Sequence, residues 1–318
     1  MEKISSKNIE ARTGRLFGDL WHHLDDEQFE QSVALFARRF KANGFDLSWL
    51  EGKKCLDVGC GGGRYTIAMG RLGAGQMTGC DISDDGLADA RLRANGMSKV
   101  SFEKASVLNL PFEEENFDFI CCSGVLHHTT DADKGLDELT RVLRPGGRLY
   151  LLLYGTGGLR WAVGCALRPI AQELGYNFMD RAVEKARLPA NNRRNFLDDF
   201  FVPIVTFVDW ETLYGKLDVR GFKKIERWEK GRLDHEVSPG LQREEFKKMV
   251  RIFQAAAELA EDGNRELAER GLATARDFLA RTQEKIAAWD RGNISDAELE
   301  FAVTGEGNHR VLAVKGDA

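Results

Sequence analysis

A glycine-rich segment constrains the fold of this chain more than any other feature. Residues 55–58 read Cys-Leu-Asp-Val, and residues 59–64 read Gly-Cys-Gly-Gly-Gly-Arg. The short apolar segment is typical of a buried strand, and the glycines predict a tight turn that opens a helix at Arg64. Because glycine has no β-carbon, the backbone amides of this turn can approach a bound molecule closely. The sequence therefore predicts a strand, a ligand-binding turn and a helix.

The spacing of the glycines separates two classes of ligand. A dinucleotide fingerprint has the form G-x-G-x-x-G, but Arg64 occupies the position of its third glycine. Asp57, Gly59, Gly61 and Gly63 instead form the pattern D-x-G-x-G-x-G. This pattern resembles motif I of the class I S-adenosylmethionine-dependent methyltransferases, which implies S-adenosylmethionine as the cofactor. A glycine turn that binds nothing is the alternative.

The composition is that of a globular protein with a negative charge. The chain has 318 residues, of which 43% are hydrophobic and 30% are charged, and its formal net charge is −5. Such a chain has no global positive field to attract a phosphate backbone, which disfavours nucleic acid as a partner. The N-terminus has no apolar signal core, and no apolar segment approaches the roughly 18 residues that span a membrane. We therefore expect no membrane association.

The cysteines indicate a reducing compartment. The chain has six of them, including the adjacent pair Cys121 and Cys122, and no C-x-x-C pair occurs. Neighbouring residues of a strand point to opposite faces of the sheet, so this pair does not suggest a disulfide, and the spacings do not suggest a zinc site. We expect a cytoplasmic protein without a bound metal.

Apolar strands alternate with amphipathic helices, which predicts an α/β protein. The expected fold is a Rossmann-like, doubly wound sheet of seven mostly parallel strands with helical lid insertions. Asp81 follows the second strand, about 20 residues past the glycine turn, where an acidic side chain can accept hydrogen bonds from both hydroxyls of a ribose. A nicotinamide cofactor would use such an acid too. After the first strand, we expect strands at 76–80, 100–105, 117–122, 148–154, 222–228 and 309–315.

Three further motifs narrow the resemblance. Residues 110–120 read LPFEEENFDFI, residues 123–128 read SGVLHH, and residues 144–147 read RPGG. Together with the glycine turn and Asp81, they are similar to the methyltransferase type 11 family, which is related to the ubiquinone and menaquinone biosynthesis enzymes. The resemblance covers residues 55–154 and implies methyl transfer from S-adenosylmethionine.

The resemblance also implies which residues hold the cofactor. The glycine turn holds the methionine part, Asp81 the ribose, and Ser123 to Leu126 the sulfonium side. Family members commonly have an aspartate, which reaches the adenine amino group, where this chain has Ser106. We expect the Ser106 hydroxyl and the Val107 amide to contact the adenine instead. The full set implied in this way is Asp57, Gly59, Cys60, Gly61, Gly63, Asp81, Ile82, Ser106, Val107, Ser123 and Leu126.

The two histidines that end the fourth-strand motif allow more than one interpretation. His127 and His128 follow a strand at the edge where open α/β sheets bind ligands. Imidazole titrates near neutral pH and can take a proton from an acceptor hydroxyl or amine, and we select His128 as the candidate catalytic base. Alternatively, one histidine packs against the helix that begins at Asp131, and the other only shapes the pocket. A metal site formed by these three residues is disfavoured, because no second carboxylate cluster lies nearby in the sequence.

A helix is predicted ahead of the first strand. Apolar side chains recur at helical spacing within residues 25–40, Asp25 or Asp26 is the expected N-cap, and residues 43–44 end the helix. In similar methyltransferases such a helix lies over the cofactor pocket, which would place Phe17 and Trp21 near the substrate. Simple packing of the helix against the sheet is the alternative.

Residues 156–220 interrupt the alternation where similar enzymes build a lid for substrate recognition. Arg193 and Arg194 can clamp a carboxylate or a phosphate of the substrate. Asp199 begins a D-x-x-x-P element that resembles one in similar small-molecule methyltransferases. In the alternative interpretation, the two arginines pair with Asp198 and Asp199 as a structural network of the lid.

A second insertion separates the last two strands. Apolar stripes within residues 246–257 and 272–289 predict two long amphipathic helices, which we expect to cover the active site. A dimerisation surface is the alternative, so an oligomer through this insertion stays open. The expected organisation is an N-terminal helical cap (1–50), the cofactor-binding core (51–155), the lid (156–220), the final core strands (within 221–237 and 309–318) and the helical insertion (238–308).

The expected function is methyl transfer from S-adenosylmethionine to an oxygen or nitrogen of a small metabolite. A C-methyltransferase that acts on a quinone-like ring is the alternative enzyme, and a non-catalytic protein that binds S-adenosylmethionine is the alternative from another class. Methylation of protein or nucleic acid is disfavoured, because residues 123–128 lack the (N/D)-P-P-(Y/F) motif that clamps planar amides and exocyclic amines.

Overall fold

The computed structural model describes residues 6–22, 25–188, 190–229 and 239–317. The chain divides into two compact units. Unit 1 consists of Met1–Tyr154, Pro203–Arg232 and Asn308–Ala318, and unit 2 consists of Gly155–Val202 and Leu233–Gly307. Each unit is assembled from segments that lie far apart in the sequence.

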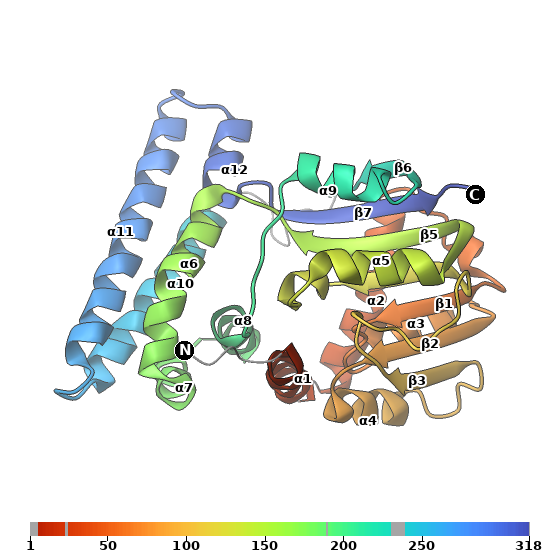
Figure 1. Ribbon diagram of the computed structural model, residues 1–318. Coiled ribbons are helices and arrows are strands. Elements are labelled where there is room, and N and C mark those ends of the chain that lie inside the picture. The colour runs from red at the N-terminus through yellow and green to blue at the C-terminus, as the bar shows by residue number, and fades with distance from the viewer. Residues whose placement is uncertain (1–5, 23–24, 189, 230–238, 318) are drawn as a thin grey trace. The chain divides into compact units, whose positions relative to one another are not determined.

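Unit 1 is built around one seven-stranded sheet with the strand order β3-β2-β1-β4-β5-β7-β6 (Figure 1). β7 runs antiparallel to β5 and β6, whereas the other neighbouring strands are parallel. The predicted doubly wound, mostly parallel sheet is thus confirmed. The strands are β1 (Lys54–Val58), β2 (Gln76–Asp81), β3 (Val100–Lys104), β4 (Phe117–Ser123), β5 (Leu143–Tyr154), β6 (Phe222–Arg227) and β7 (Asn308–Lys315).

Helices cover both faces of this sheet, with an apolar core on each face. Leu139 of α5 and Leu213 of α9 belong to one core, and Phe40 of α2 and Ile67 of α3 belong to the other. The Phe40 ring lies 4.8 Å from that of Tyr150 on β5, so α2 packs directly on the sheet. The helices of unit 1 are α1 (Ser6–His22), α2 (Asp26–Ala42), α3 (Arg64–Arg71), α4 (Asp84–Arg93), α5 (Ala132–Val142) and α9 (Trp210–Asp218), with short 3-10 turns at Leu47–Leu50 and Leu126–His128.

The strand β5 begins earlier than the sequence predicts. Residues 144–147 were expected to form a turn, but Phe117 pairs with Leu143 and Phe119 with Arg148, so these four residues bulge out within one continuous strand. The bulge needs glycine, because Gly146 has φ +71° and a β-carbon on residue 147 would lie 2.8 Å from a backbone oxygen.

Among its described residues, unit 2 consists of helices joined by loops and contains no strand. α10 packs against α11 and α7, and α6 packs against α11, α8 and α12. Phe253 of α10 and Ala275 of α11 are fully buried, so the predicted apolar stripes form an intramolecular core. The short helix α12, which the sequence analysis did not anticipate, begins with a reciprocal capping box between Ser295 and Glu298. The helices are α6 (Gly158–Leu174), α7 (Tyr176–Lys185), α8 (Ala190–Phe201), α10 (Pro239–Leu259), α11 (Arg265–Asp290) and α12 (Asp296–Thr304).

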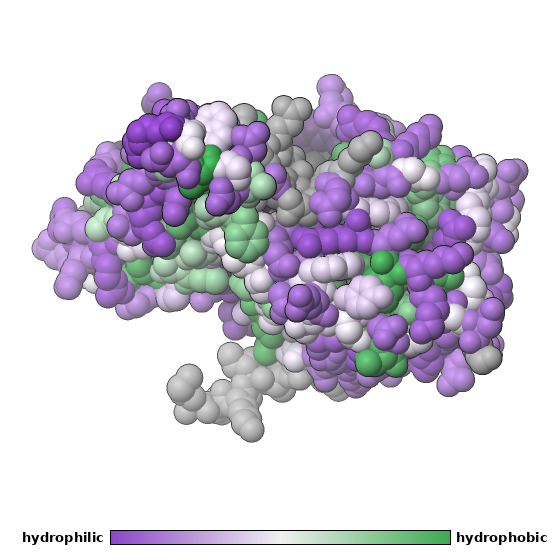
Figure 2. Space-filling model, turned by 90° about the horizontal axis from the view of Figure 1, so that it is seen from above, coloured by the Kyte–Doolittle hydropathy of each residue, from purple (hydrophilic) through white to green (hydrophobic). Residues whose placement is uncertain are grey.

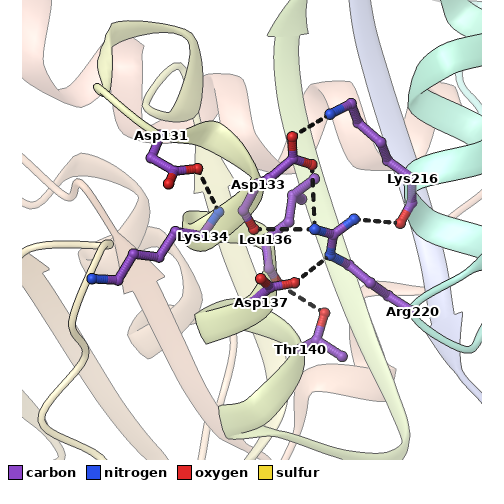
Figure 3. Close-up of polar contacts among 8 residues, drawn as sticks. All are labelled: Asp131, Asp133, Lys134, Leu136, Asp137, Thr140, Lys216 and Arg220. Atoms are coloured by element: carbon purple, nitrogen blue, oxygen red, sulfur yellow. Dashed lines mark hydrogen bonds and ion pairs between the residues drawn. The ribbon is translucent and has the colours of Figure 1, made fainter.

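A network of charges joins α5 to the end of α9 (Figure 3). The Arg220 guanidinium donates to Asp137 at 2.7 Å and to the Asp133 side chain and backbone at 3.2 Å. Lys216 also pairs with Asp133. Asp131 caps α5 by accepting from the Lys134 amide at 2.9 Å. These contacts fix α5 directly after the predicted histidine motif.

The face of the molecule seen from above is mostly polar (Figure 2). Hydrophilic residues make up most of the face seen in Figure 2, and hydrophobic residues appear there only in small separate groups. Among the described residues, none of the helices combines the length and the apolar composition that crossing a membrane requires.

We expect Arg220→Ala to lower the free energy of unfolding by about 1–2 kcal/mol, because it removes several charge-assisted hydrogen bonds of a side chain that is only 15% exposed. The matched control is Lys223→Ala, which removes an exposed ion pair with Asp218 at 3.6 Å and should cost less than about 0.5 kcal/mol. Urea denaturation followed by circular dichroism measures both. Equal losses in the two variants would show that the network does not stabilise the fold.

Candidate functional site

The glycine turn is held by hydrogen bonds to the end of the neighbouring strand β2. The amides of Gly59 and Cys60 both donate to the Cys80 carbonyl, at 2.8 and 3.0 Å, and the Gly63 amide donates to the Cys60 carbonyl at 2.9 Å. The Gly61 amide donates to a carboxylate oxygen of Asp81 at 2.8 Å. Most amides of the turn therefore bond to the protein itself, which leaves the Gly62 amide, just before α3, to meet a ligand.

Two of the glycines are required by close packing, and one is not. Gly59, Gly61 and Gly63 all have positive φ, at +70°, +51° and +81°. A β-carbon on Gly59 would lie 2.2 Å from Val125, and one on Gly63 would lie 2.9 Å from Ala90. A β-carbon on Gly61 would meet no atom within 4 Å. The turn is therefore closed on the side of Gly59 and open at Gly61.

Asp81 stands at the open side of the turn, at the end of β2. Its other carboxylate oxygen accepts from the Ser83 amide at 2.8 Å. Burial raises the pKa of Asp81, and the hydrogen bonds from the Ser83, Gly61 and Ile82 amides oppose this shift. A small pocket lies at this point, and it is lined by Phe17, Gly18, Gly61, Gly62, Asp81, Ser83, Gly86 and Asp89.

Asp57, the first residue of the glycine pattern, is buried beneath the turn. Its carboxylate accepts a hydrogen bond from the Thr66 hydroxyl at 2.7 Å, which ties β1 to α3. Burial raises the pKa of Asp57 to about 7, against the lowering effect of the Thr66 hydrogen bond and of the nearby Arg64 charge. Asp57 therefore has a structural role: its bond to Thr66 holds α3 against β1 on either side of the turn.

The helix beside the pocket is α1 rather than the helix predicted at residues 25–40. α1 packs against α4, and β-carbons on Gly14 and Gly18 would lie 3.2 Å from Ile82 and 2.5 Å from Ser83. Phe17 lines the pocket, and its predicted place near the substrate stays a prediction. The predicted helix, α2, packs against α3 and the core of the sheet instead, because its aromatic stripe is fully apolar. The side chain of Trp21 lies outside the described residues.

The loop after β3 brings Ser106 and Val107 to the same edge of the sheet. The Ser106 hydroxyl donates to the Glu10 carboxylate on α1 and accepts from the Leu108 amide at 3.1 Å. Val107 is buried in the core. The sequence analysis missed Glu10, whose partner is 96 residues away, although Glu10, Gly14 and Gly18 share a four-residue spacing that places them on one face of a helix.

The loop after β4 carries both histidines at the same edge. His128 Nδ1 lies 2.8 Å from the Ile204 carbonyl oxygen, and the ring is 5.3 Å from that of Phe17. The His127 ring stacks on Tyr154 at 3.8 Å, and neither of its nitrogens has a hydrogen-bond partner within the described parts of the chain. Burial, and secondly the charge of His128, lower the pKa of His127 well below its usual value, so His127 is neutral. Ser123 ends β4, and Leu126 is buried beneath this loop.

The charged residues predicted for the lid lie in unit 2. Arg193 forms a bidentate ion pair with Asp180 of α7, at 2.6 and 2.7 Å, rather than with Asp198 or Asp199. Asp198 and Asp199 follow Arg193 by five and six residues and so lie on other sides of α8, which explains why Arg193 pairs with Asp180 instead. The Asp199 backbone oxygen accepts from Arg168 at 2.6 Å. Burial and the Asp199 charge raise the pKa of Asp198, whereas the charges of Arg194 and Arg168 lower it.

No cluster of three side chains able to hold a metal ion occurs among the described residues. All six cysteines are free thiols, and only Cys165 is exposed.

Comparisons with known proteins place this site in context. A family model described as a methyltransferase domain matches residues 56–151. A demethylmenaquinone methyltransferase from Clavibacter sepedonicus is 31% identical over 179 residues, which are 55% of this chain and 67% of that protein. Methyltransferase GfsG from Streptomyces halstedii is 39% identical over 101 residues, which are 31% of this chain and 36% of that protein. The chain thus spans about two thirds of the first relative and about a third of the second.

The fold also resembles a solved structure. Phosphoethanolamine N-methyltransferase 2 from Haemonchus contortus, in complex with phosphomonomethylethanolamine and S-adenosylhomocysteine, has a TM-score of 0.51 and 18% identity. The match covers 99% of this chain and 61% of that chain. At this identity the likeness shows the fold alone.

We expect alanine substitutions at Gly59 and Gly61 to differ in their effect on stability. Gly61→Ala should cost only about 1–2 kcal/mol, because it strains a positive φ but meets no neighbouring atom. Gly59→Ala adds a clash with Val125 and should cost several kcal/mol more. Thermal unfolding measures both. Equal losses would contradict the assignment of Gly59 to the closed side of the turn.

The raised pKa of Asp57 predicts a pH dependence of stability. Between about pH 4 and pH 7 the folded protein holds a proton that the unfolded chain has lost, so this group makes the protein less stable as the pH rises through that window. Asp57→Asn removes the titration, so the stability of wild type relative to the variant should fall by on the order of 4 kcal/mol from pH 4 to pH 8. Urea denaturation at several pH values tests this, and parallel stability curves would contradict it.

Proposed function

Because this chain belongs to the S-adenosylmethionine-dependent methyltransferases, we propose that it transfers a methyl group from S-adenosylmethionine to an oxygen or nitrogen of a small metabolite. The acceptor atom and the residues assigned below are part of this proposal.

The residues around the glycine turn fit the cofactor. The open space at Gly61 lies beside the Asp81 carboxylate, within a pocket that α1 borders. The Asp81 carboxylate accepts hydrogen bonds from the Gly61, Ser83 and Ile82 amides, and a carboxylate has about four lone-pair sites, which leaves capacity for a ribose hydroxyl. The Gly62 amide and the start of α3 suit the carboxylate of the methionine part, since a helix N-terminus favours negative charge. Ser123 and Leu126 would border the sulfonium side.

When bound, S-adenosylmethionine supplies a methyl group that is already electrophilic. The contribution of the protein is therefore to align the acceptor with that methyl group and to exclude water. Phe17 on α1 supports this role, because it lies against the pocket on one side and near His128 on the other.

One observation carries the choice of an oxygen or nitrogen acceptor. A hydroxyl or amine loses a proton when it is methylated, and His128, whose ring lies 5.3 Å from that of the pocket residue Phe17, is our candidate to take it. A carbonyl oxygen only accepts hydrogen bonds, so the contact with Ile204 supports a tautomer with its hydrogen on Nδ1, and in the proposal Nε2 takes the proton. The neutral His127 beside it adds no competing charge.

Methylation of carbon in a quinol-like ring is the second candidate. It is favoured by the demethylmenaquinone methyltransferases among the relatives and by the aromatic rings of Phe17 and Tyr154 beside His128. A non-catalytic protein that binds S-adenosylmethionine is the third possibility, and turnover of any acceptor would exclude it. A screen of hydroxylated, amino and quinol acceptors with labelled S-adenosylmethionine separates these three.

The proposal also covers the partners and the location of the protein. The net charge of −5 supports a small-molecule acceptor rather than nucleic acid, and six free thiols support a cytoplasmic location. A role of Arg193, Arg194 and Asp199 in acceptor recognition and an oligomer through residues 238–308 remain predictions.

We expect Asp81→Ala to weaken the binding of S-adenosylmethionine by about 10- to 100-fold, since it removes a carboxylate from two ribose hydroxyls. Isothermal titration calorimetry measures this, with NADH as the competing ligand. Asp84→Ala is the matched control, because Asp84 is exposed at the start of α4 and pairs with Lys104. Binding of NADH in place of S-adenosylmethionine would overturn the cofactor assignment.

We expect His128→Ala to lower kcat by about 10²- to 10⁴-fold with little change in cofactor affinity, as for the loss of a general base. His127→Ala is the comparison variant and should affect stability more than the chemical step. A loss of less than about tenfold for His128→Ala would show that alignment alone supports the reaction.

A further inference from the structure

The inner face of α1 carries a carboxylate in line with two glycines, of which Gly18 lines the pocket. Glu10, Gly14 and Gly18 are spaced four residues apart and so lie on one face of the helix. Gly14 approaches Ile82 at the end of β2, and Gly18 approaches Ser83. The same face thus continues from the pocket at Gly18 to the carboxylate of Glu10.

Glu10 is held at the loop that follows β3. The Ser106 hydroxyl donates its one hydrogen to Glu10 Oε1 and accepts from the Leu108 amide. Ser106 therefore has no hydrogen left for another acceptor, and it positions a carboxylate that comes from a different part of the chain. Both side chains are half-buried.

The order of the strands places this carboxylate beyond the ribose site. The glycine turn follows β1, Asp81 ends β2, and Ser106 follows β3, which is the next strand along the sheet. An adenosine whose ribose contacts Asp81 and whose sulfonium side faces β4 extends its base in the opposite direction, toward the loop after β3. The amino group of adenine then reaches the side of the sheet where Glu10 lies.

The chemistry of the two groups is complementary. The exocyclic amino group of adenine only donates hydrogen bonds, and a carboxylate only accepts them. Glu10 Oε1 accepts from Ser106, and the structure assigns no partner to Oε2 among the residues that it describes. A carboxylate has about four lone-pair sites, so one bond from Ser106 leaves room for the amino group.

We propose that Glu10 recognises the adenine amino group of the cofactor and that Ser106 positions its carboxylate. The proposal rests on the S-adenosylmethionine site of the proposed function. It accounts for the serine at a position where the family resemblance predicts an aspartate, because α1 supplies the acidic group instead. α1 is then a specificity-determining element of the cofactor site as well as its cover.

The test compares S-adenosylhomocysteine with S-inosylhomocysteine, in which a carbonyl oxygen replaces the amino group. Wild type should bind the adenosyl compound about 10- to 100-fold more tightly, since two acceptors face each other in the inosyl complex. In Glu10→Gln the preference should fall at least about tenfold, because an amide can pair with either group. Calorimetry gives both affinities without any turnover.

Two further variants make the result specific. Glu103→Gln, which removes an exposed carboxylate from β3, should keep the wild-type preference. Ser106→Asp in the Glu10→Gln background restores a carboxylate to this loop and should restore the preference.

Each outcome decides the proposal. If Glu10→Gln keeps the wild-type preference, whether or not both compounds bind more weakly, Glu10 does not recognise the amino group and the proposal is overturned. Binding of S-adenosylhomocysteine by wild type would still leave the proposed function standing. If wild type binds neither compound, the proposed function itself fails, and the inference fails with it.

Discussion

The hydrogen bonds between the glycine turn and the end of β2 are the constraint on which the site depends. The Cys80 carbonyl accepts from two amides of the turn, and Asp81 accepts from a third. The turn and the acidic residue are therefore one rigid piece of structure, although 20 residues separate Gly61 from Asp81. The parallel pairing of β1 with β2 makes this possible, because it brings the two carboxyl ends to the same edge of the sheet.

The hydrogen bonds and close contacts within the turn also give its glycines different roles. The glycine pattern predicts a turn whose backbone amides meet a ligand, but in the structure the amides of residues 59, 60, 61 and 63 bond to the protein itself. Gly59 is required because Val125 of the β4 loop leaves no space for a β-carbon. Only at Gly61 does the absence of a side chain leave open space. The pattern of glycines thus reflects close packing at Gly59 and Gly63 and open space at Gly61.

Much of unit 1 could be predicted because its signals are local. A buried parallel strand is a short apolar segment, and Ser83, Asp131 and Asp25 begin helices through contacts within three residues. What could not be predicted depends on contacts between distant residues. Glu10 meets Ser106 across 96 residues. The cover helix was assigned to residues 25–40, because their aromatic stripe gives a clearer periodic signal than the face of α1, on which two glycines replace apolar side chains.

Those glycines also lower the stability of α1 as an isolated helix. Each glycine within a helix costs about 1 kcal/mol relative to alanine, and α1 has no acidic residue in its first turn to offset its dipole. The helix is therefore weak by itself and depends on its contacts with α4, Ile82 and Ser106. Its glycines allow a close approach that larger side chains would prevent. A ligand that contacts both α1 and the glycine turn binds the docked helix in preference to the undocked one, so its binding free energy also stabilises α1. Binding of the ligand and folding of the helix that covers it are therefore thermodynamically coupled.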